Sequence, residues 1–186
     1  MSSPKIPALG YALLGLLMKP SSGYDLRKIF SSTSLKTYSG SPGAIYPALQ
    51  RLQKQGLIRG TVEEGSGLRR RQIFRLAPKG VAELKAWIAL PITREELTSG
   101  LKTMMLRFAF SEIAVGPVAS LAILKSLETA LQPHLQNLRE QLQAMKAAPR
   151  SAQLALDCGI RSYESLLDWA NDGIAIYEKQ TEGGVS

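Results

Sequence analysis

The chain has 186 residues and carries 23 Lys and Arg against 15 Asp and Glu, a formal net charge of +8. This length allows a sizeable core and favours two small domains. The apolar run 8–18 is too short to span a bilayer and lacks the charge of a signal peptide, and the single cysteine, Cys158, excludes an internal disulfide, so we expect a cytoplasmic protein.

The excess positive charge is confined to the first half. Residues 1–90 contain 14 Lys and Arg against 4 Asp and Glu, whereas residues 91–186 contain 9 against 11. This asymmetry predicts a polyanionic partner for the first half, either nucleic acid or an anionic membrane surface. The alternative is that the charge only keeps the protein soluble.

Two short helices are predicted before residue 34. Residues 6–18 are apolar nearly all round, as in a helix buried on most sides. Ser22 can cap the second helix, with Asp25 three residues further on, and a core stripe continues to about residue 33.

A third, amphipathic helix is predicted over 41–58, with Ser41 as its cap and Pro42 at its first position. Its buried stripe comprises Ile45, Leu49, Leu52 and Gly56. Pro47 falls inside this helix on the opposite face, at a cost of roughly 3 kcal/mol, and the missing side chain of Gly43 is expected to leave room for a kink. The candidate contact residues of this segment are Ser41, Gly43, Ala44, Tyr46, Pro47, Gln50, Arg51 and Lys54.

The next two segments predict a β-ribbon with a basic tip. The strands are "LIRGTVEE" (57–64) and "RRQIFRLA" (70–77). Arg69, Arg70 and Arg71 beside flexible glycines can neutralise phosphates or enter a minor groove, with Glu63 and Glu64 facing away. Three helices followed by a ribbon and a fourth helix from Pro78 is the order of a winged helix-turn-helix, whose third helix enters the major groove.

The side chains of the third helix suggest separate roles at such an interface. Gln50 can pair with adenine and Arg51 with guanine or a phosphate, whereas Tyr46 can contact a phosphate or a thymine methyl group. Lys54 lies further along the helix and is expected to contact a phosphate. The alternative interpretation is that Tyr46 is a partly buried core aromatic and Lys54 is only solvated.

The second half is predicted to be helical. We expect a winged helix-turn-helix at 1–90, a linker at 91–100, and a helical domain at 101–180 with helices near 101–111, 118–147 and after Pro149. The last helix carries an almost regular heptad seam, which predicts a homodimer, although neighbouring helices of one subunit could cover it instead. The seam residues are Leu156, Ile160, Tyr163, Leu167, Ala170, Ile174 and Tyr177.

Large polarisable side chains suggest a pocket for a small aromatic effector, where the DNA-binding half meets the helices. These candidates are Trp87, Met104, Met105, Phe108, Tyr163 and Trp169. The alternative is that each is an ordinary core residue.

Other function classes fit less well. The single histidine, His134, lies in a leucine-rich helix far from Cys158, so we expect no catalytic site, metal or cofactor. A protein-binding adaptor remains the main alternative, but such modules tend to lack a basic wing. A membrane-surface protein would need a helix with a long apolar face and a lysine-rich opposite face, which the basic half lacks.

Four consecutive motifs resemble the PadR family of transcriptional regulators: "YALLGLL" (11–17), "SGYDLRKIF" (22–30), "SPGAIYPALQRLQKQGLI" (41–58) and "RRRQIFRLAPKG" (69–80). The resemblance implies a homodimeric repressor that binds a palindromic operator and is released by a small, often aromatic, effector. Two positions depart from the family pattern. Ala44 replaces a frequently polar residue, which removes a base contact, and Ala77-Pro78 replaces a common Thr-Glu helix start.

Overall fold

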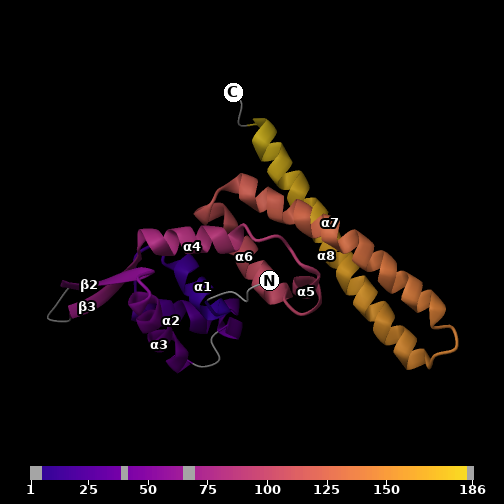
Figure 1. The fold of residues 1–186 in the computed structure, drawn as a ribbon, viewed down its shortest axis with the longest axis horizontal. Coiled ribbons are helices and arrows are strands. Elements are labelled where there is room, and N and C mark those ends of the chain that lie inside the picture. The colour runs from indigo at the N-terminus through magenta and orange to yellow at the C-terminus, as the bar shows by residue number, and fades with distance from the viewer. Residues whose placement is uncertain (1–5, 39–41, 65–69, 184–186) are drawn as a thin grey trace. The chain divides into compact units, whose positions relative to one another are not determined.

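The computed structural model describes residues 6–38, 42–64 and 70–183. It divides into two compact units, one formed by Met1–Leu90 with Ala109–Ala114 and the other by Pro91–Phe108 with Val115–Ser186. The fold class is as predicted: a winged helix-turn-helix with a small antiparallel sheet is followed by a helical unit (Figure 1).

The first unit is built on three short helices, α1 (Ala8–Leu16), α2 (Gly23–Ser32) and α3 (Ile45–Lys54). Two 3-10 helices, η1 (Ser34–Tyr38) and η2 (Pro42–Ala44), lie between α2 and α3. The predicted cap of the second helix is confirmed, because Asp25 N donates to Ser22 Oγ at 3.1 Å. The core of the three helices consists of Leu13, Leu14, Leu26, Phe30, Ile45, Leu49 and Leu52, each at most 2% exposed.

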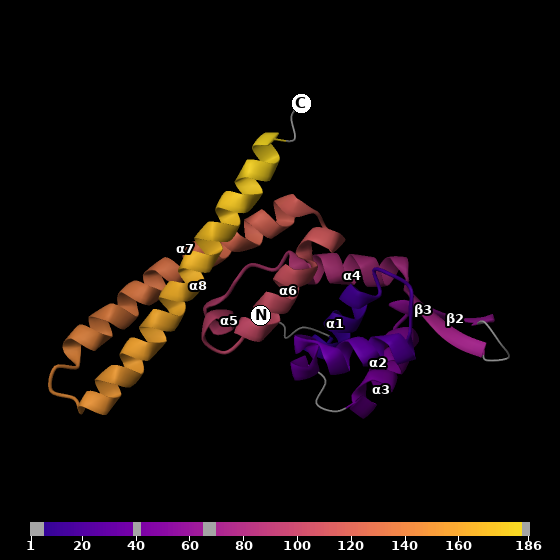
Figure 2. The ribbon, with the colours of Figure 1, turned by 180° about the vertical axis from the view of Figure 1, so that it is seen from behind.

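A three-stranded antiparallel sheet has the order β1-β3-β2. It contains the two predicted strands, β2 (Ile58–Glu64) and β3 (Arg70–Leu76), and a two-residue strand β1 (Ser21–Ser22) that the sequence did not predict. The ribbon of β2 and β3 projects from the helices (Figure 2), which makes it the wing. Helix α4 (Pro78–Ile88) follows with Pro78 in its first turn, as predicted.

The third helix begins later than predicted. Ser41 lies outside the described residues, Pro42 opens η2, and α3 begins at Ile45. Pro47 is therefore in the first turn of α3, where an amide N–H would have no partner within the helix. The prediction that Pro47 lies in the helix interior is wrong, and its missing N–H removes no α-helical hydrogen bond.

Gly56 ends α3 and is not part of its buried stripe. Its φ of 72° lies in the left-handed region, and the residue is exposed. The N–H of Leu57 donates to the carbonyl of Leu52 at 3.0 Å, closing the turn that terminates the helix. The polypeptide thus passes directly from α3 into β2 of the wing.

The second unit contains α5 (Arg94–Thr98), most of α6 (Leu101–Ala114), α7 (Pro117–Ala144) and α8 (Arg150–Gly183). The long helices α7 and α8 lie side by side in both views of the ribbon. Leu97, in the segment predicted as a linker, is buried in the core of this unit. That core comprises Leu97, Met104, Leu124, Leu127, Leu131 and Ala170.

Candidate nucleic-acid interface

Helix α3 has one buried and one exposed face. Ile45, Ala48, Leu49 and Leu52 pack inward, so the helix is held by its apolar side. The outward residues are predicted contact residues: Gly43, Tyr46, Pro47, Gln50, Arg51 and Lys54 are exposed, and Ala44 is half-buried. Tyr46 is 46% exposed and lies outside the buried core.

The register of the wing determines which of its side chains share a face. Glu63 lies opposite Arg71, and Arg59 lies opposite Arg75, so these four residues are on one face of the ribbon. Arg75 donates to Glu63 across 2.5 Å. The expectation that Glu63 faces away from the wing cations is therefore wrong. Arg69 lies outside the described residues, and only the backbone of Arg70 is described.

Helix α3 and the wing border one concave surface. A hollow of about 480 Å³ is lined by Ser22, Gly23, Tyr24, Tyr46, Arg71, Gln72 and Phe74. The ring of Tyr46 lies close against the start of α2, since a Cβ on Gly23 would come within 2.7 Å of Tyr46 Cε1. The hollow therefore brings Tyr46 and Arg71, predicted from separate motifs, to the same place.

The charges of this surface are unbalanced. Within the described part of the first unit, Asp25 binds Ser22, Glu63 binds Arg75 and Glu83 accepts from Tyr11. None of the ion pairs among the described residues involves the exposed cations Arg51, Lys54 and Arg71. A surface with cations that lack acidic partners attracts a polyanion.

Three residues beside this surface were not predicted from the sequence. Tyr24 lines the hollow and is 60% exposed, and the guanidinium of Arg27 lies 5.9 Å from the centre of its ring. Arg59 is exposed on the charged face of the wing. The alternation of residues 57–63 could have identified Arg59, whereas the place of Tyr24 depends on the approach of β3 to α2.

Comparisons with known proteins agree with this geometry. Residues 13–86 match the model of the transcriptional regulator PadR-like family. The helices and wing of the first unit therefore resemble a PadR-like regulator domain.

Two relatives of this chain are themselves named as regulators. It is 26% identical over 188 residues to the probable transcriptional regulator Rv1176c of Mycobacterium tuberculosis, covering 93% of this chain and 100% of the relative. It is 35% identical over 82 residues to the negative transcriptional regulator PadR of Bacillus subtilis, covering 43% and 44%. The crystal structure of Bacillus subtilis PadR in complex with operator DNA aligns with a TM-score of 0.42 at 20% identity, covering 91% of this chain and 98% of the other.

The candidate effector residues of the chain are divided between the two units. Trp87 is 3% exposed in the first unit and stacks on Tyr11, with ring centres 4.1 Å apart. Burial and the neighbouring Glu83 raise the pKa of Tyr11, whose hydroxyl donates to Glu83 at 3.1 Å. The other five candidates belong to the second unit: Met104 (1% exposed), Met105, Phe108, Tyr163 and Trp169 (37% exposed).

The predicted dimer seam packs within its own unit. Ile160 and Ala170 are buried, and Leu156 is half-buried. Tyr163, Leu167, Ile174 and Tyr177 pack against the core of this unit, which is formed by Leu97, Met104, Ala170 and three leucines of α7. Packing within one chain therefore occurs, as the alternative required, and dimerisation through these residues stays a prediction. Cys158, on the same helix, is exposed.

Neither a membrane span nor a metal cluster is found in the described ranges. No helix there is long and apolar enough to cross a membrane. Among the same residues, no group of three or more His, Cys, Asp or Glu is placed to hold a metal ion.

Proposed function

We propose that this chain is a ligand-responsive homodimeric repressor that binds a palindromic DNA operator through α3 and the wing. The observation that carries the proposal is the single concave surface bordered by Tyr46 of α3 and Arg71 of β3. A major groove is wide enough to admit a helix such as α3, while the ribbon reaches the flanking backbone. The name of the negative regulator PadR, 35% identical over 82 residues, supports repression.

Within this proposal, the exposed residues of α3 divide into two groups. Gln50 reads adenine through its amide, and Arg51 contacts guanine or a phosphate. Tyr46 and Lys54 position the helix through contacts to the backbone, as does the segment from Ser41 to Ala44. Arg69, Arg70 and Arg71 add sequence-independent affinity from the wing.

In this proposal, the second unit holds two chains together and binds the effector. A two-fold pair of chains would present two copies of α3 to two half-sites of one operator. The exposed apolar side chains of α8 support an interface beyond the packing with α7, and they are Leu154 (61%), Trp169 (37%) and Ile176 (58%). An effector acts only if it binds better to the arrangement of the pair that does not fit DNA.

The test removes the wing cations. The R69A/R70A/R71A variant should bind the operator more weakly, and the slope of log affinity against log salt should decrease by about 0.9 for each phosphate that the variant no longer neutralises. Fluorescence anisotropy on operator fragments selected from genomic DNA measures both quantities. The matched control is K146A/R150A/K179A, which removes three exposed cations from the second unit.

The control should retain the wild-type affinity and slope, and both variants should retain the wild-type circular dichroism spectrum. Equal losses of affinity in the two variants would show that only net charge matters and would remove the wing from the proposal. A wild-type chain that ignores DNA duplexes at low salt would favour the adaptor alternative.

A further inference from the structure

A hollow in the second unit has no role in the proposed binding of DNA. It has a volume of about 380 Å³ and lies between α5 and α7. Its walls are formed by Arg94 and Leu97 of α5 and by Ala130, Pro133, His134 and Asn137 of α7. This volume is at the lower end of the range of small-molecule sites.

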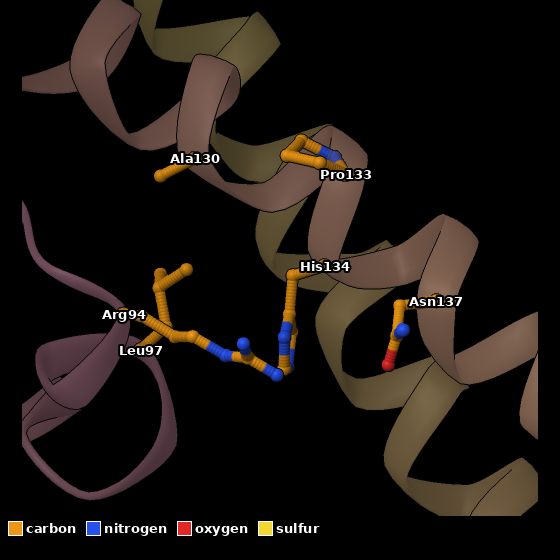
Figure 3. A pocket seen from close by; sticks show the side chains of 6 residues that line it. All are labelled: Arg94, Leu97, Ala130, Pro133, His134 and Asn137. Atoms are coloured by element: carbon orange, nitrogen blue, oxygen red, sulfur yellow. The ribbon is translucent and has the colours of Figure 1, made fainter.

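The hollow contains three polar side chains on otherwise apolar walls. Figure 3 shows the Arg94 side chain extending across it toward the ring of His134. His134 Nε2 is buried and makes no hydrogen bond to the described residues, and none of their ion pairs involves Arg94. A buried nitrogen without a partner is costly, so a ligand that bonds it gains affinity.

Both walls of the hollow are held in place by contacts with Tyr163 of α8. The ring of His134 stands edge-on to Tyr163, with centres 4.6 Å apart and planes at 84°. Tyr163 donates its hydroxyl proton to the carbonyl of Leu97 at 3.1 Å, which ties α8 to α5. The orientation of the imidazole therefore does not depend on the ligand.

Helix α5 is only five residues long, and its position is fixed by a carboxylate. Glu96 closes a capping box with Thr93, and it also accepts from Arg107 Nη1 at 3.1 and 3.3 Å. Burial lowers the pKa of Arg107, which is 1% exposed, while the charge of Glu96 opposes this shift. Glu96 is engaged in these contacts and does not line the hollow. Arg94 is therefore the charged side chain of α5 among the lining residues.

We propose that this hollow binds a small organic monocarboxylate. The carboxylate would accept from the guanidinium of Arg94 and from His134 Nε2–H, with the amide of Asn137 as a further donor. Leu97, Ala130 and Pro133 would cover the apolar part of the ligand. This inference rests on the proposed function in one respect, because it assigns the effector of the repressor to this site.

The test uses the fact that His134 is the only histidine of the chain, so its imidazole NMR signals need no assignment. Acetate, butyrate and benzoate are titrated into the full-length protein, with benzamide as the uncharged counterpart of benzoate. Saturable shifts of the His134 signals are expected with at least one carboxylate, and binding of benzamide should be weaker than that of benzoate.

The substitution R94A should weaken carboxylate binding by about 10- to 100-fold, because a hydrogen bond to a charged group is removed. The matched control is Arg139→Ala, which removes an exposed arginine from α7 outside the hollow and should bind as the wild type does. Absence of a saturable shift with all three acids would overturn the proposal. Equal binding by R94A, or equal binding of benzamide and benzoate, would also overturn it.

Operator binding without any added acid is measured on the same samples, so the two proposals can fail separately. Loss of carboxylate binding with intact DNA binding refutes only the assignment of this hollow. Carboxylate binding by a chain that ignores DNA supports the hollow and refutes its regulatory role.

Discussion

Gln50 is the exposed side chain of α3 whose chemistry is most specific for one base. Its amide can both donate to and accept from adenine, which a cation cannot do. Gln50→Ala should therefore reduce discrimination at one operator position by about 1–3 kcal/mol while changing nonspecific binding little. Binding to a panel of operators with single base changes measures this.

Lys54→Ala provides the comparison for Gln50, because Lys54 lies one turn further along the same exposed face. It should weaken binding to every sequence by a similar factor, as expected of a phosphate contact. A uniform loss of affinity in Gln50→Ala would show that Gln50 contacts only the DNA backbone.

For single residues, the sequence predicted which side chains are exposed better than it predicted their ion-pair partners. The period of α3 identified Tyr46, Gln50, Arg51 and Lys54 as exposed, because a helix that buries one apolar stripe must expose the other. The pair between Arg75 and Glu63 was not predicted, because it depends on the register of two strands joined through residues 65–69. The arginine and histidine of the hollow come from helices far apart in the sequence.

The contact between α4 and the turn that joins α3 to β2 depends on Gly80. A Cβ at this position would lie 2.0 Å from the carbonyl oxygen of Leu57, which also accepts from Ala77 N at 2.9 Å. Gly80→Ala should lower the free energy of unfolding by about 1–3 kcal/mol, because the backbone must move and the higher helix propensity of alanine does not compensate. Urea unfolding measures this change.

Gly159→Ala is the matched control for this substitution. Gly159 lies inside α8, and a Cβ there would meet nothing within 4 Å. The free energy of unfolding should therefore increase by up to about 1 kcal/mol. Destabilisation by both substitutions would contradict the steric explanation for Gly80.

Among the elements, those with strong local patterns were predicted, and those set by distant contacts were not. Residues 58–64 and 70–76 form strands as their composition indicates. Strand β1 has only two residues and exists through its pairing with Ile73 and Phe74, for which no local signal is available. The start of α3 was misjudged because serine and proline at 41–42 are typical of a helix start, yet the chain forms a 3-10 turn first.

For the whole molecule, the proposed two-fold pair predicts a strict spacing of half-sites. Two copies of α3 should read half-sites about one helical turn, roughly 34 Å, apart. Insertion of about half a turn, roughly 5 bp, between the half-sites should abolish tight binding, and insertion of a full turn should restore part of it only if the pair can stretch. Anisotropy with spaced operators, together with sedimentation equilibrium, measures spacing and assembly.

A monomer of 20.2 kDa that binds the original and the spaced operators equally would refute the proposed two-fold pair of chains.

The sequence could indicate two parts from the charge asymmetry and the long leucine-rich helices. It could not show that residues 109–114 of α6 belong to the first unit, where the ring of Phe110 covers Gly15 of α1. This division of one helix between two units follows from tertiary contacts and has no periodic signal.

The place of Pro47 has a consequence for engineering new specificities. Growth of α3 by a full turn toward residue 41 would move Pro47 into the helix interior, at a cost of about 3 kcal/mol. Libraries randomised at Gly43 and Ala44 should therefore change the side chains just before α3. Gln50 and Arg51 should keep their orientation on the exposed face of the helix. The ring of Pro47 thus fixes where α3 begins, so the base-contacting positions of the helix can be counted from it.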